Sequence, residues 1–595
     1  MTSALPPDAP SNARRRASKS DGAGEKPWFW GHRWLLVLGV VGAIVFLPAL
    51  RSPLLLDDYV QVAMLEGHYP GQRNPLDLYN FVTDANRDEL ATRGILPWWS
   101  DPHLTIRFFR PLSSALRAGD HAVFGADTLP AHLHSFAWWG ACVVGAWLLF
   151  RRLASERAAK IATAMFALAP CHGLPLAWIS NREVFVSLAF GTFALVAYTR
   201  LQDGERRQGW LAAFLFALSL AGGEYAIGFI GYFFALELFR ARDGKGARLL
   251  RLAPVAVLVC IYLCVRRQLH CAAIGSGLYR DPFQEPLRFL ETAPQRLAAV
   301  FIDGWLTSSS PTWDVPHVVL VGFAIAIGWV LYRAISFALG TVDGNERRSL
   351  RALLLGSVLA LVPVLSVAPS PRTLGVATLG VACAIGVLVD RSWYRVAAEK
   401  DEAHGGELMR GAAAILVFAR LVHGPGIAFS SLVAVRESAL QFAASAQAVG
   451  ARVDAAPRHD VNVLRGEWET MLWAPFALNA RHEAPAHWRV LTLAHHALVL
   501  RKDEHTLEIV APRDTGIFPV GEDDLFRSET APVVIGEDVS VGGITVTSFA
   551  LPKSIGVRVT FDEPIDDDGI WIAQKGVELV DCAPPKPGFG VPLDR

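Results

Sequence analysis

Long apolar runs alternate with short charged segments over the first 430 or so residues of the chain. Most are long enough for a helix that crosses the hydrocarbon core of a bilayer. We therefore predict a polytopic α-helical membrane protein with about eleven transmembrane helices. The runs lie at roughly 34–50, 132–150, 161–179, 183–199, 209–222, 224–239, 252–269, 316–336, 351–368, 373–390 and 411–432.

The pattern changes after about residue 433. A short amphipathic segment, SLVAVRESALQFAASAQAVG, leads into stretches in which apolar and polar residues alternate, such as WRVLTLAHHALVL, HTLEIVAP, VSVGGITVTSFA and IGVRVTFD. Period-two alternation with intervening turn residues is typical of strands. Residues 433–595 carry 15 basic and 24 acidic residues. We predict an acidic, β-rich domain on the outer side of the membrane.

Basic residues mark one side of the membrane. The segments RRLASERAAK, RLQDGERRQ, RARDGKGARLLR, NERRSLR and RSWYRVAAEK separate successive pairs of apolar runs and hold most of the Lys and Arg between them. The positive-inside rule therefore predicts a cytoplasmic N-terminus and an exoplasmic C-terminal domain. Residues 1–30 are predicted to be a disordered cytoplasmic tail, and residues 31–432 the membrane domain. A signal peptide is the alternative for the first apolar run, but its length and the many later runs favour an uncleaved span.

Composition agrees with this topology and excludes some functions. Hydrophobic residues make up 52% of the chain and charged residues 19%, with a mean hydropathy of +0.31. The formal net charge is zero, so no global basic field would attract nucleic acid. The seven cysteines indicate neither a disulfide framework nor a zinc site, although the sequence also permits a disulfide between Cys271 and Cys582.

Two predicted outer loops are large, at 51–131 and 270–315. The first holds Asp57-Asp58, Trp98-Trp99 and the stretch FFRPLSSALRAGDHAVFG, whose apolar residues fall near one helical face. That face predicts a helix lying in the membrane interface. The second loop contains Pro and Gly and is expected to reach over the first.

The acidic pair Asp57-Asp58 is the strongest pointer to function. Two adjacent carboxylates at the mouth of a membrane helix repel each other and resist desolvation. One of them is suited to act as a general base whose pKa its neighbour raises, and the second to bind substrate or a cation. A merely solvated helix end is the alternative.

Further charged residues fall at predicted outer turns. Arg110 lies in the first loop, and Arg182, Glu224 and Arg372 lie at three tight turns between apolar runs. Each alone fits an ordinary helix end or a snorkelling side chain. Together, on the face that carries Asp57-Asp58, they predict one polar cavity. No HExxH motif, metal-ligand set, P-loop or nucleotide fingerprint is present in the sequence.

These segments resemble those of a known family. The acidic pair after a first span, then FRPLSSALRAGDHAVFG, HLHSFAWW, ISNREVFVSLAF, GGEYAIGFIGYFFALELF and SPRTLGVATLG, are similar in order and spacing to the GT-C superfamily. The most similar branch is that of the protein O-mannosyltransferase-like enzymes, including the transmembrane-and-TPR mannosyltransferases. The resemblance covers roughly residues 30–390. Asn181 and Gly223 depart from the Gly and Lys usual there, and no TPR period is visible.

The resemblance implies a glycosyltransferase that uses a polyprenyl-phosphate-linked sugar as donor. Asp57 or Asp58 would be the catalytic base. Arg110, Arg182, Glu224 and Arg372 would bind the donor phosphate or substrate, with transfer direct and inverting. The resemblance leaves the need for a divalent cation open. The acceptor would be a glycan, lipid or protein.

The location and the alternatives complete the prediction. A composition rich in Ala, Gly and Arg and poor in Lys points to a GC-rich bacterium, hence to the inner membrane and a periplasmic C-terminal domain. A non-enzymatic transporter or polysaccharide-assembly protein is the alternative. It should carry internal repeats and polar residues near mid-bilayer, whereas the polar residues here lie mostly at outer helix ends. A degenerate glycosyltransferase is a third interpretation.

Overall fold

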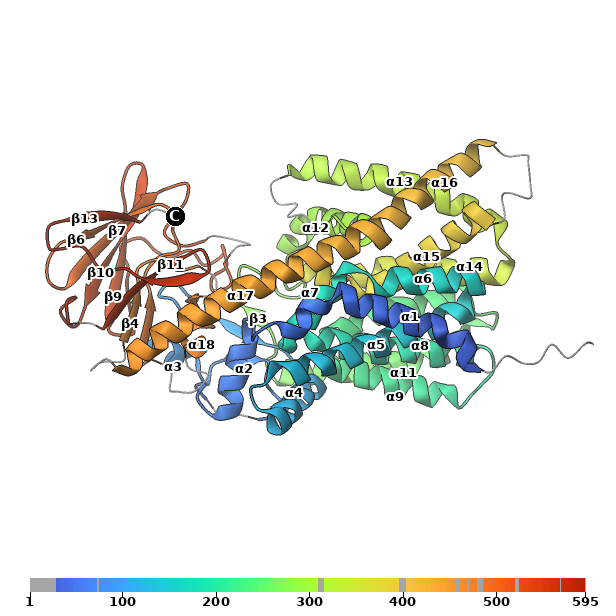
Figure 1. Cartoon of the computed structure of the whole chain (residues 1–595), viewed down its shortest axis with the longest axis horizontal. Coiled ribbons are helices and arrows are strands. Elements are labelled where there is room, and N and C mark those ends of the chain that lie inside the picture. The colour runs from blue at the N-terminus through green and yellow to red at the C-terminus, as the bar shows by residue number, and fades with distance from the viewer. Residues whose placement is uncertain are drawn as a thin grey trace, which may run out of the picture.

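The computed structural model describes residues 28–593, except 72–73, 309–314, 395–402, 456–459, 468–469, 479–484, 520–523 and 568. Figure 1 shows a helical bundle at one end of an elongated molecule and a β-rich region at the other, connected by the long helix α17 (Gly424–Ala455). Most of the predicted tail, residues 1–27, lies outside the described residues.

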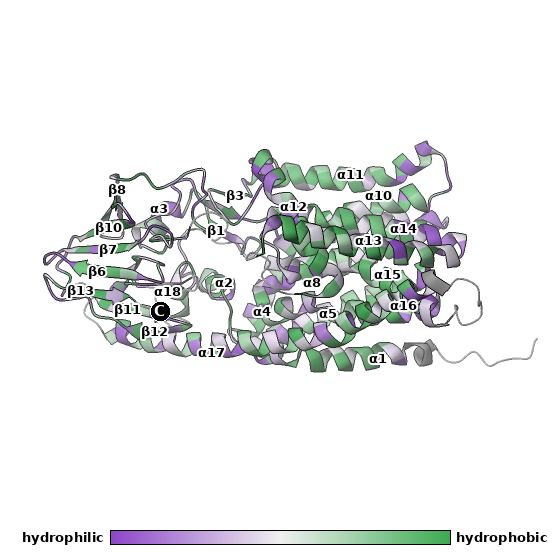
Figure 2. Cartoon of the chain, turned by 90° about the horizontal axis from the view of Figure 1, so that it is seen from above, coloured by the Kyte–Doolittle hydropathy of each residue, from purple (hydrophilic) through white to green (hydrophobic). Residues whose placement is uncertain are grey.

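Seven helical segments of the described chain are long and apolar enough to cross a membrane. They are Thr128–Leu153, Ile179–Gln202, Lys245–Gln268, His317–Thr341, Gly344–Ser366, Pro371–Trp393 and Gly406–Ala455, and Arg33–Val45 and Gln208–Gly222 are shorter apolar helices. The apolar stretch of Pro371–Trp393 is entirely buried, so this helix forms the centre of the bundle. In Figure 2 the bundle helices are largely hydrophobic, and hydrophilic residues gather near the helix ends.

The described residues contain fewer helices of this length than the eleven or so predicted spans, for local reasons. The predicted run 161–179 breaks after α6 (Glu156–Ala167), because Pro170 and Pro175 lack the N–H that a continuous helix needs. The segment continues as η2 (Pro170–His172), α7 (Gly173–Ala177) and η3 (Ile179–Arg182). The run 224–239 divides into η4 (Glu224–Gly228) and the short α10 (Phe229–Phe239). These irregular turns carry several of the predicted site residues.

The remaining helices of the bundle follow the predicted runs more closely. They are α1 (Trp28–Val45), η1 (Leu47–Arg51), α5 (Thr128–Leu153), α8 (Glu183–Gln202), α9 (Gln208–Gly222), α11 (Lys245–Gln268), α13 (His317–Thr341), α14 (Gly344–Leu361), η6 (Pro363–Ser366), η7 (Pro371–Leu374), α15 (Gly375–Tyr394) and α16 (Ala403–Phe418). A π-helical turn at Ala419–His423 joins α16 to α17. The amphipathic segment that was predicted as separate belongs to α17, which runs through the predicted boundary at 432/433.

The two large loops are folded and joined. The first contains α2 (Asp57–Glu66), β1 (Asn80–Val82), α3 (Arg87–Thr92), β2 (Thr105–Arg107) and α4 (Pro111–Phe124), and the second contains β3 (Ala273–Ile274) and α12 (Pro286–Leu306). Strands β1, β2 and β3 form one antiparallel sheet. The second loop is therefore hydrogen-bonded to the first through the pairing of β3 with β2.

Helix α4 buries polar residues and exposes apolar ones. Its buried residues are Ser113, Ser114, Arg117 and Asp120, whereas Val123 is 73% exposed. An outward apolar surface beside the bundle fits the predicted position in the membrane interface. The polar face is turned toward the rest of the first loop and the bundle.

The C-terminal region is β-rich, as the alternating pattern predicted. Its strands are β4 (Asp460–Val463), β5 (His487–Val490), β6 (Ala497–Arg501), β7 (Thr506–Pro512), β8 (Asp538–Val541), β9 (Ile544–Ala550), β10 (Ser554–Phe561), β11 (Ile570–Lys575), β12 (Glu578–Asp581) and β13 (Gly590–Leu593). An antiparallel sheet has the order β13-β6-β7-β10-β9-β8, and a mixed sheet the order β12-β11-β4-β5. The short helix α18 (Ala474–Ala477) lies between β4 and β5 in sequence.

The C-terminal region and the first loop share one hydrophobic core. Buried residues of the loop, including Tyr59, Trp98 and Trp99, pack in a single cluster with Phe442, Trp488 and strand residues such as Val546. The indole N–H of Trp98 donates to the carbonyl of Leu491 at 3.1 Å. This shared core holds the C-terminal region over the end of the bundle where the site residues lie.

Candidate functional site

Asp58 is a buried carboxylate at the start of α2 whose oxygens are fully used. One oxygen accepts hydrogen bonds from the backbone and the hydroxyl of Ser180, at 2.6 and 2.5 Å. The other accepts from the amides of Leu55 and Ile179, at 3.0 and 3.3 Å. Buried Arg117 lies close enough for Asp58 to act on it electrostatically. Asp58 thus fastens α2 to η3.

Asp57, its neighbour, is half-buried and far less constrained. Within the described chain its carboxylate accepts one hydrogen bond, from the indole N–H of Trp473 at 2.8 Å. Burial, helped by the charge of Asp58, raises the pKa of Asp57 from 3.8 to about 6, against the opposing effects of Trp473, Arg372 and Arg110. Leu56, just before the pair, has a φ of +44°, a sharp turn that a non-glycine residue seldom adopts.

Arg372 lies in η7, within electrostatic reach of Asp57. Its guanidinium is 5.0 Å from the centre of the Trp178 ring. Among the described residues it has no hydrogen-bond or ion-pair partner. Arg372 and Asp57 also act on Tyr279, whose pKa burial raises to about 12, so the second large loop borders the same place.

Arg110 is enclosed by carboxylates and aromatic rings. Its Nε donates to Glu224 at 2.7 Å and its Nη1 to Glu183 at 3.0 Å. The rings of Tyr79 and Phe108 each lie 4.7 Å from the guanidinium. The two carboxylates raise the pKa of Arg110 well above its ordinary value although burial lowers it. Arg110, predicted as a contact for the donor phosphate or substrate, is thus paired with two carboxylates of the protein.

Three buried oxygen atoms around this ion pair lack a hydrogen-bond partner in the described chain. They are Oε2 of Glu183, Oε1 of Glu224 and Oδ1 of Asn181. The amide of Asn181 donates to the other oxygen of Glu183 at 2.8 Å, which holds the two side chains together. Buried acceptors without donors are costly, so this corner is suited to a ligand that brings hydroxyl or amine groups.

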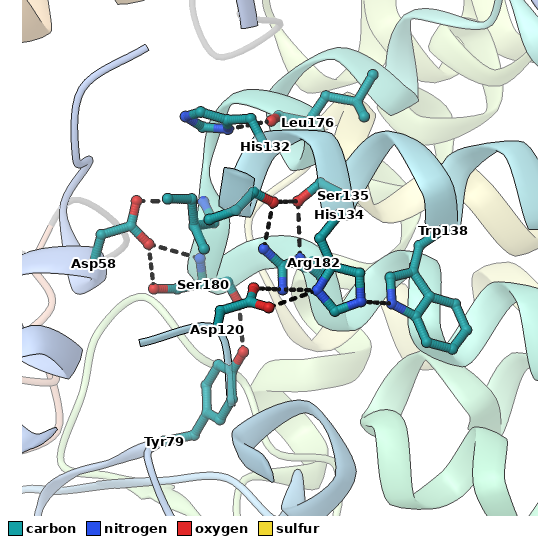
Figure 3. Close-up of polar contacts among 12 residues, drawn as sticks. Asp58, Tyr79, Asp120, His132, His134, Ser135, Trp138, Leu176, Ser180 and Arg182 are labelled. Carbon is teal, nitrogen blue, oxygen red and sulfur yellow. Dashed lines mark hydrogen bonds and ion pairs between the residues drawn. The ribbon is translucent and has the colours of Figure 1, made fainter. Parts of the chain in front are cut away.

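Arg182 is buried and its donors are occupied (Figure 3). It donates to the hydroxyl of Ser135 at 2.9 Å and to the carbonyl of Ala131 at 2.6 Å, and it pairs with Asp120. His134 joins the network by its contact with Asp120 at 2.8 Å, which, with Arg182, holds the pKa of Asp120 below its ordinary value against burial. The predicted phosphate ligand Arg182 therefore connects α5, η3 and α4.

The structure brings together most but not all of the predicted residues. Asp57, Arg110, Glu224 and Arg372 border one region, whereas Asp58 and Arg182 hold its supporting turns. The sequence patterns did not single out Glu183, Trp473 or Arg280. Trp473 follows the segment with β4, where no motif marked it. Arg280 is buried, and its Nε and Nη1 lack partners among the described residues. Its backbone amide donates to the carbonyl of Ser366, which is close in sequence to η7.

The described residues were compared with the requirements of a metal site and of a disulfide. No group of three or more His, Cys, Asp or Glu side chains there is placed to hold a metal ion. All seven cysteines are free, including Cys271 and Cys582.

No protein-family model matches this chain, and no curated protein matches its sequence. Among solved structures, it is similar to the archaeal oligosaccharyltransferase AglB from Archaeoglobus fulgidus in complex with an inhibitory peptide and a dolichol-phosphate. The TM-score is 0.42 at 12% identity over 78% of this chain and 64% of that one. The chain thus spans less than two thirds of that enzyme's length.

Two further solved structures are similar to a comparable degree. ArnT from Cupriavidus metallidurans bound to undecaprenyl phosphate has a TM-score of 0.38 at 13% identity, over 89% of this chain and 98% of that one. The arabinofuranosyltransferase AftD from Mycobacteria has a TM-score of 0.38 at 15% identity, over 77% and 33%. At TM-scores below 0.5 these likenesses decide neither the fold nor the activity of this chain.

Proposed function

We propose that this protein is an integral-membrane glycosyltransferase of the GT-C type. It would move a sugar from a polyprenyl-phosphate donor to an acceptor hydroxyl at the membrane face that the C-terminal region covers. One observation carries the proposal. Asp57, whose carboxylate accepts a single hydrogen bond in the described chain, lies within electrostatic reach of Arg372, whose guanidinium has no hydrogen-bond or ion-pair partner there.

Asp57 is the proposed general base. With a pKa of about 6 its carboxylate is ionised at neutral pH and still basic enough to accept a proton. As the acceptor oxygen attacks the anomeric carbon, its proton passes to Asp57. The bond from that carbon to the phosphate oxygen breaks, and polyprenyl phosphate leaves with the electron pair. Attack opposite the leaving group inverts the anomeric centre.

Arg372 is the proposed contact for the leaving phosphate. A guanidinium with no protein partner can donate two parallel hydrogen bonds to phosphate oxygens. Arg280 is a second proposed contact, because its buried Nε and Nη1 lack partners and its backbone lies against Ser366. Positive charge held there stabilises the negative charge that grows as the bond breaks.

The unpartnered oxygens of Asn181, Glu183 and Glu224 are proposed to accept hydrogen bonds from donor-sugar hydroxyls. Arg110 holds the two carboxylates and balances part of their charge. A side chain at Gly223 would begin 3.5 Å from Cγ of Arg110, an ordinary van der Waals contact, so Arg110 lies directly beside this position. Arg110 therefore supplies the positive charge there.

Asp58 and Arg182 are proposed positioning residues. Their hydrogen bonds fix η3 and the first turn of α2, and with them the direction of Asp57. Location in a bacterial inner membrane, with the N-terminus cytoplasmic and the C-terminal region periplasmic, stays part of the proposal. The experiment below tests the mannosyltransferase-like specificity, the acceptor and the need for a divalent cation.

The test is sugar transfer by purified protein in detergent or nanodiscs. Radiolabelled polyprenyl-phosphate mannose, glucose and arabinose would be donors, a membrane extract the acceptor, and the reaction would be run with Mg²⁺ and with EDTA. The proposal expects transfer that Asp57→Asn abolishes and Asp84→Asn, at a 91% exposed carboxylate of the same loop, leaves intact. No transfer from any donor by folded protein would favour a transporter or assembly protein.

A further inference from the structure

Within the described chain, the one hydrogen bond that the Asp57 carboxylate accepts comes from a residue 416 positions later. The indole N–H of Trp473 donates to Oδ1 of Asp57 at 2.8 Å. Trp473 is buried, with 7% of its surface exposed, and belongs to the C-terminal region. The region beyond the family resemblance thus touches the residue proposed to be the base.

The segment around Trp473 is anchored on both sides. Before it, the carbonyl of Thr470 accepts a hydrogen bond from the indole of Trp488 at 2.6 Å. After it, α18 packs against α2 and α17, and the ring of Phe476 lies 5.0 Å from that of Tyr69. Trp473 is therefore held in place by the core that the C-terminal region shares with the first loop.

The approach of this segment to α17 depends on a glycine. A side chain at Gly450 would begin 2.6 Å from the carbonyl oxygen of Leu478, which is too close for any other residue without a shift of the backbone. Leu478 directly follows α18. The sequence of α17 therefore permits the contact that brings Trp473 to Asp57.

The contact has two consequences for Asp57. A donated hydrogen bond favours the ionised carboxylate, so Trp473 lowers the pKa of Asp57 against burial and the charge of Asp58. It also occupies Oδ1 alone and fixes the rotation of the carboxylate, which leaves Oδ2 to receive a proton. Both effects suit a residue that must be ionised and correctly aimed.

We propose that Trp473 is a positioning residue for Asp57, so that the C-terminal region completes the site and does not merely dock beside it. This inference rests on the proposed function, because that function makes Asp57 the base. The contact itself can be tested without any sugar donor.

The experiment measures the protonation of Asp57 directly. A hydrophobic carbodiimide reacts with protonated carboxyl groups, and tandem mass spectrometry of the full-length protein, digested after labelling, separates Asp57 from Asp58. Labelling would be followed between pH 5 and 9 in wild type, Trp473→Phe and Trp98→Phe. Trp98→Phe is the matched control, since it removes a buried indole N–H that donates to a backbone carbonyl in the same core.

The expected result is a labelling midpoint near pH 6 in wild type and in Trp98→Phe. In Trp473→Phe the midpoint should rise by about one pH unit, because the ionised carboxylate has lost its donor. Superposable curves for wild type and Trp473→Phe would overturn the proposal. Where transfer is measurable, its acid limb should move upward with the labelling midpoint.

A second measurement covers the case in which Trp473→Phe is destabilised. Melting temperatures of Trp473→Phe, Asp57→Ala and the double variant form a cycle. If the two side chains interact, the double variant should lose less than the sum of the single losses, and additive losses would overturn the contact. Labelling and melting need no donor, so a failed transfer assay would count against the proposed function and leave this result standing.

Discussion

The two ends of the helical bundle treat charge in opposite ways. At the end away from the C-terminal region, a cavity of about 670 Å³ is lined by Arg152, Arg240, Arg242 and Arg391 among acidic residues. Each of these arginines has a hydrogen-bond or ion-pair partner in the described chain, although the partner of Arg242 is the amide oxygen of Asn345 and Nε of Arg391 lacks a hydrogen bond. Arg152 and Arg240 share Asp203, both at 2.6 Å, and Arg391 meets Glu346 at 2.7 Å.

At the opposite end, under the C-terminal region, the charges do not all pair. Among the described residues Arg372 contacts only the face of Trp178, Arg280 has unpartnered donors, and Asp57 accepts a single hydrogen bond. Paired charges hold helices together, whereas charges kept unpaired at a cost in stability indicate chemistry. On the proposed function, the first end is structural and the second holds the site, and substitutions at each end should differ in their effects on stability and transfer.

The largest effect is expected for Asp57→Asn. Loss of the base should reduce sugar transfer at least about a hundredfold without loss of fold. Since burial disfavours the charge of Asp57, the variant should melt no lower than wild type at pH 8. Transfer rates and melting temperatures of the purified variant check both. Transfer retained in Asp57→Asn would remove the base from the mechanism.

Asp58→Asn is the matched substitution one residue away. An amide there places an NH₂ group among donors that now meet carboxylate oxygens, so the melting temperature should fall first. Transfer per folded molecule should be less affected than in Asp57→Asn. If Asp58→Asn lost transfer while keeping the wild-type melting temperature, the two carboxylates would have to exchange roles.

Arg182→Ala is expected to act on stability. It leaves Asp120 buried without its charge partner and should cost about 3–5 kcal/mol of unfolding free energy. Arg391→Ala, at the other end, breaks a comparable buried pair with Glu346 and should cost a similar amount. Denaturant titration of both variants measures these losses. If Arg182→Ala were as stable as wild type but had no transfer activity, Arg182 would be a contact for the donor phosphate and not a positioning residue.

Arg372→Ala, in contrast to Arg182→Ala, should lower transfer and leave stability unchanged. It removes a guanidinium that no described residue uses, so the melting temperature should stay near that of wild type. Transfer should fall about a hundredfold, because the leaving phosphate loses its proposed contact. Arg372→Lys should recover part of the rate, whereas Arg152→Ala should mainly lower stability. Equal effects of Arg372→Ala and Arg152→Ala on both measurements would erase the contrast between the two ends.

Sequence patterns predicted the long helices, the strands of the C-terminal region and the side on which the charged turns gather. They did not separate Asp57 from Asp58, because the difference depends on which carboxylate reaches the backbone of η3. They did not find Trp473 either, since a contact over 416 positions leaves no local period. The run 161–179 was predicted as one span because its hydropathy outweighed its prolines, yet those prolines form the turns that lead to Ser180 and Arg182.

The smallest expected effect, and the finest test of the contrast, is on pH. Asp57 must be ionised to accept a proton, so transfer should fall about tenfold for each pH unit below about 6 and level off above it. Because burial raises the pKa of Asp57 above its ordinary 3.8, the folded state binds this proton more tightly than the unfolded state does. The resulting stability is full below pH 4 and lost as pH rises through 6. Asp57→Asn should remove that loss, which melting curves between pH 4 and 8 measure, whereas Arg391→Ala should keep it. Because burial also raises the pKa of Asp524 to about 7, part of the total loss should remain in Asp57→Asn. A loss as large in Asp57→Asn as in wild type would contradict the raised pKa of Asp57.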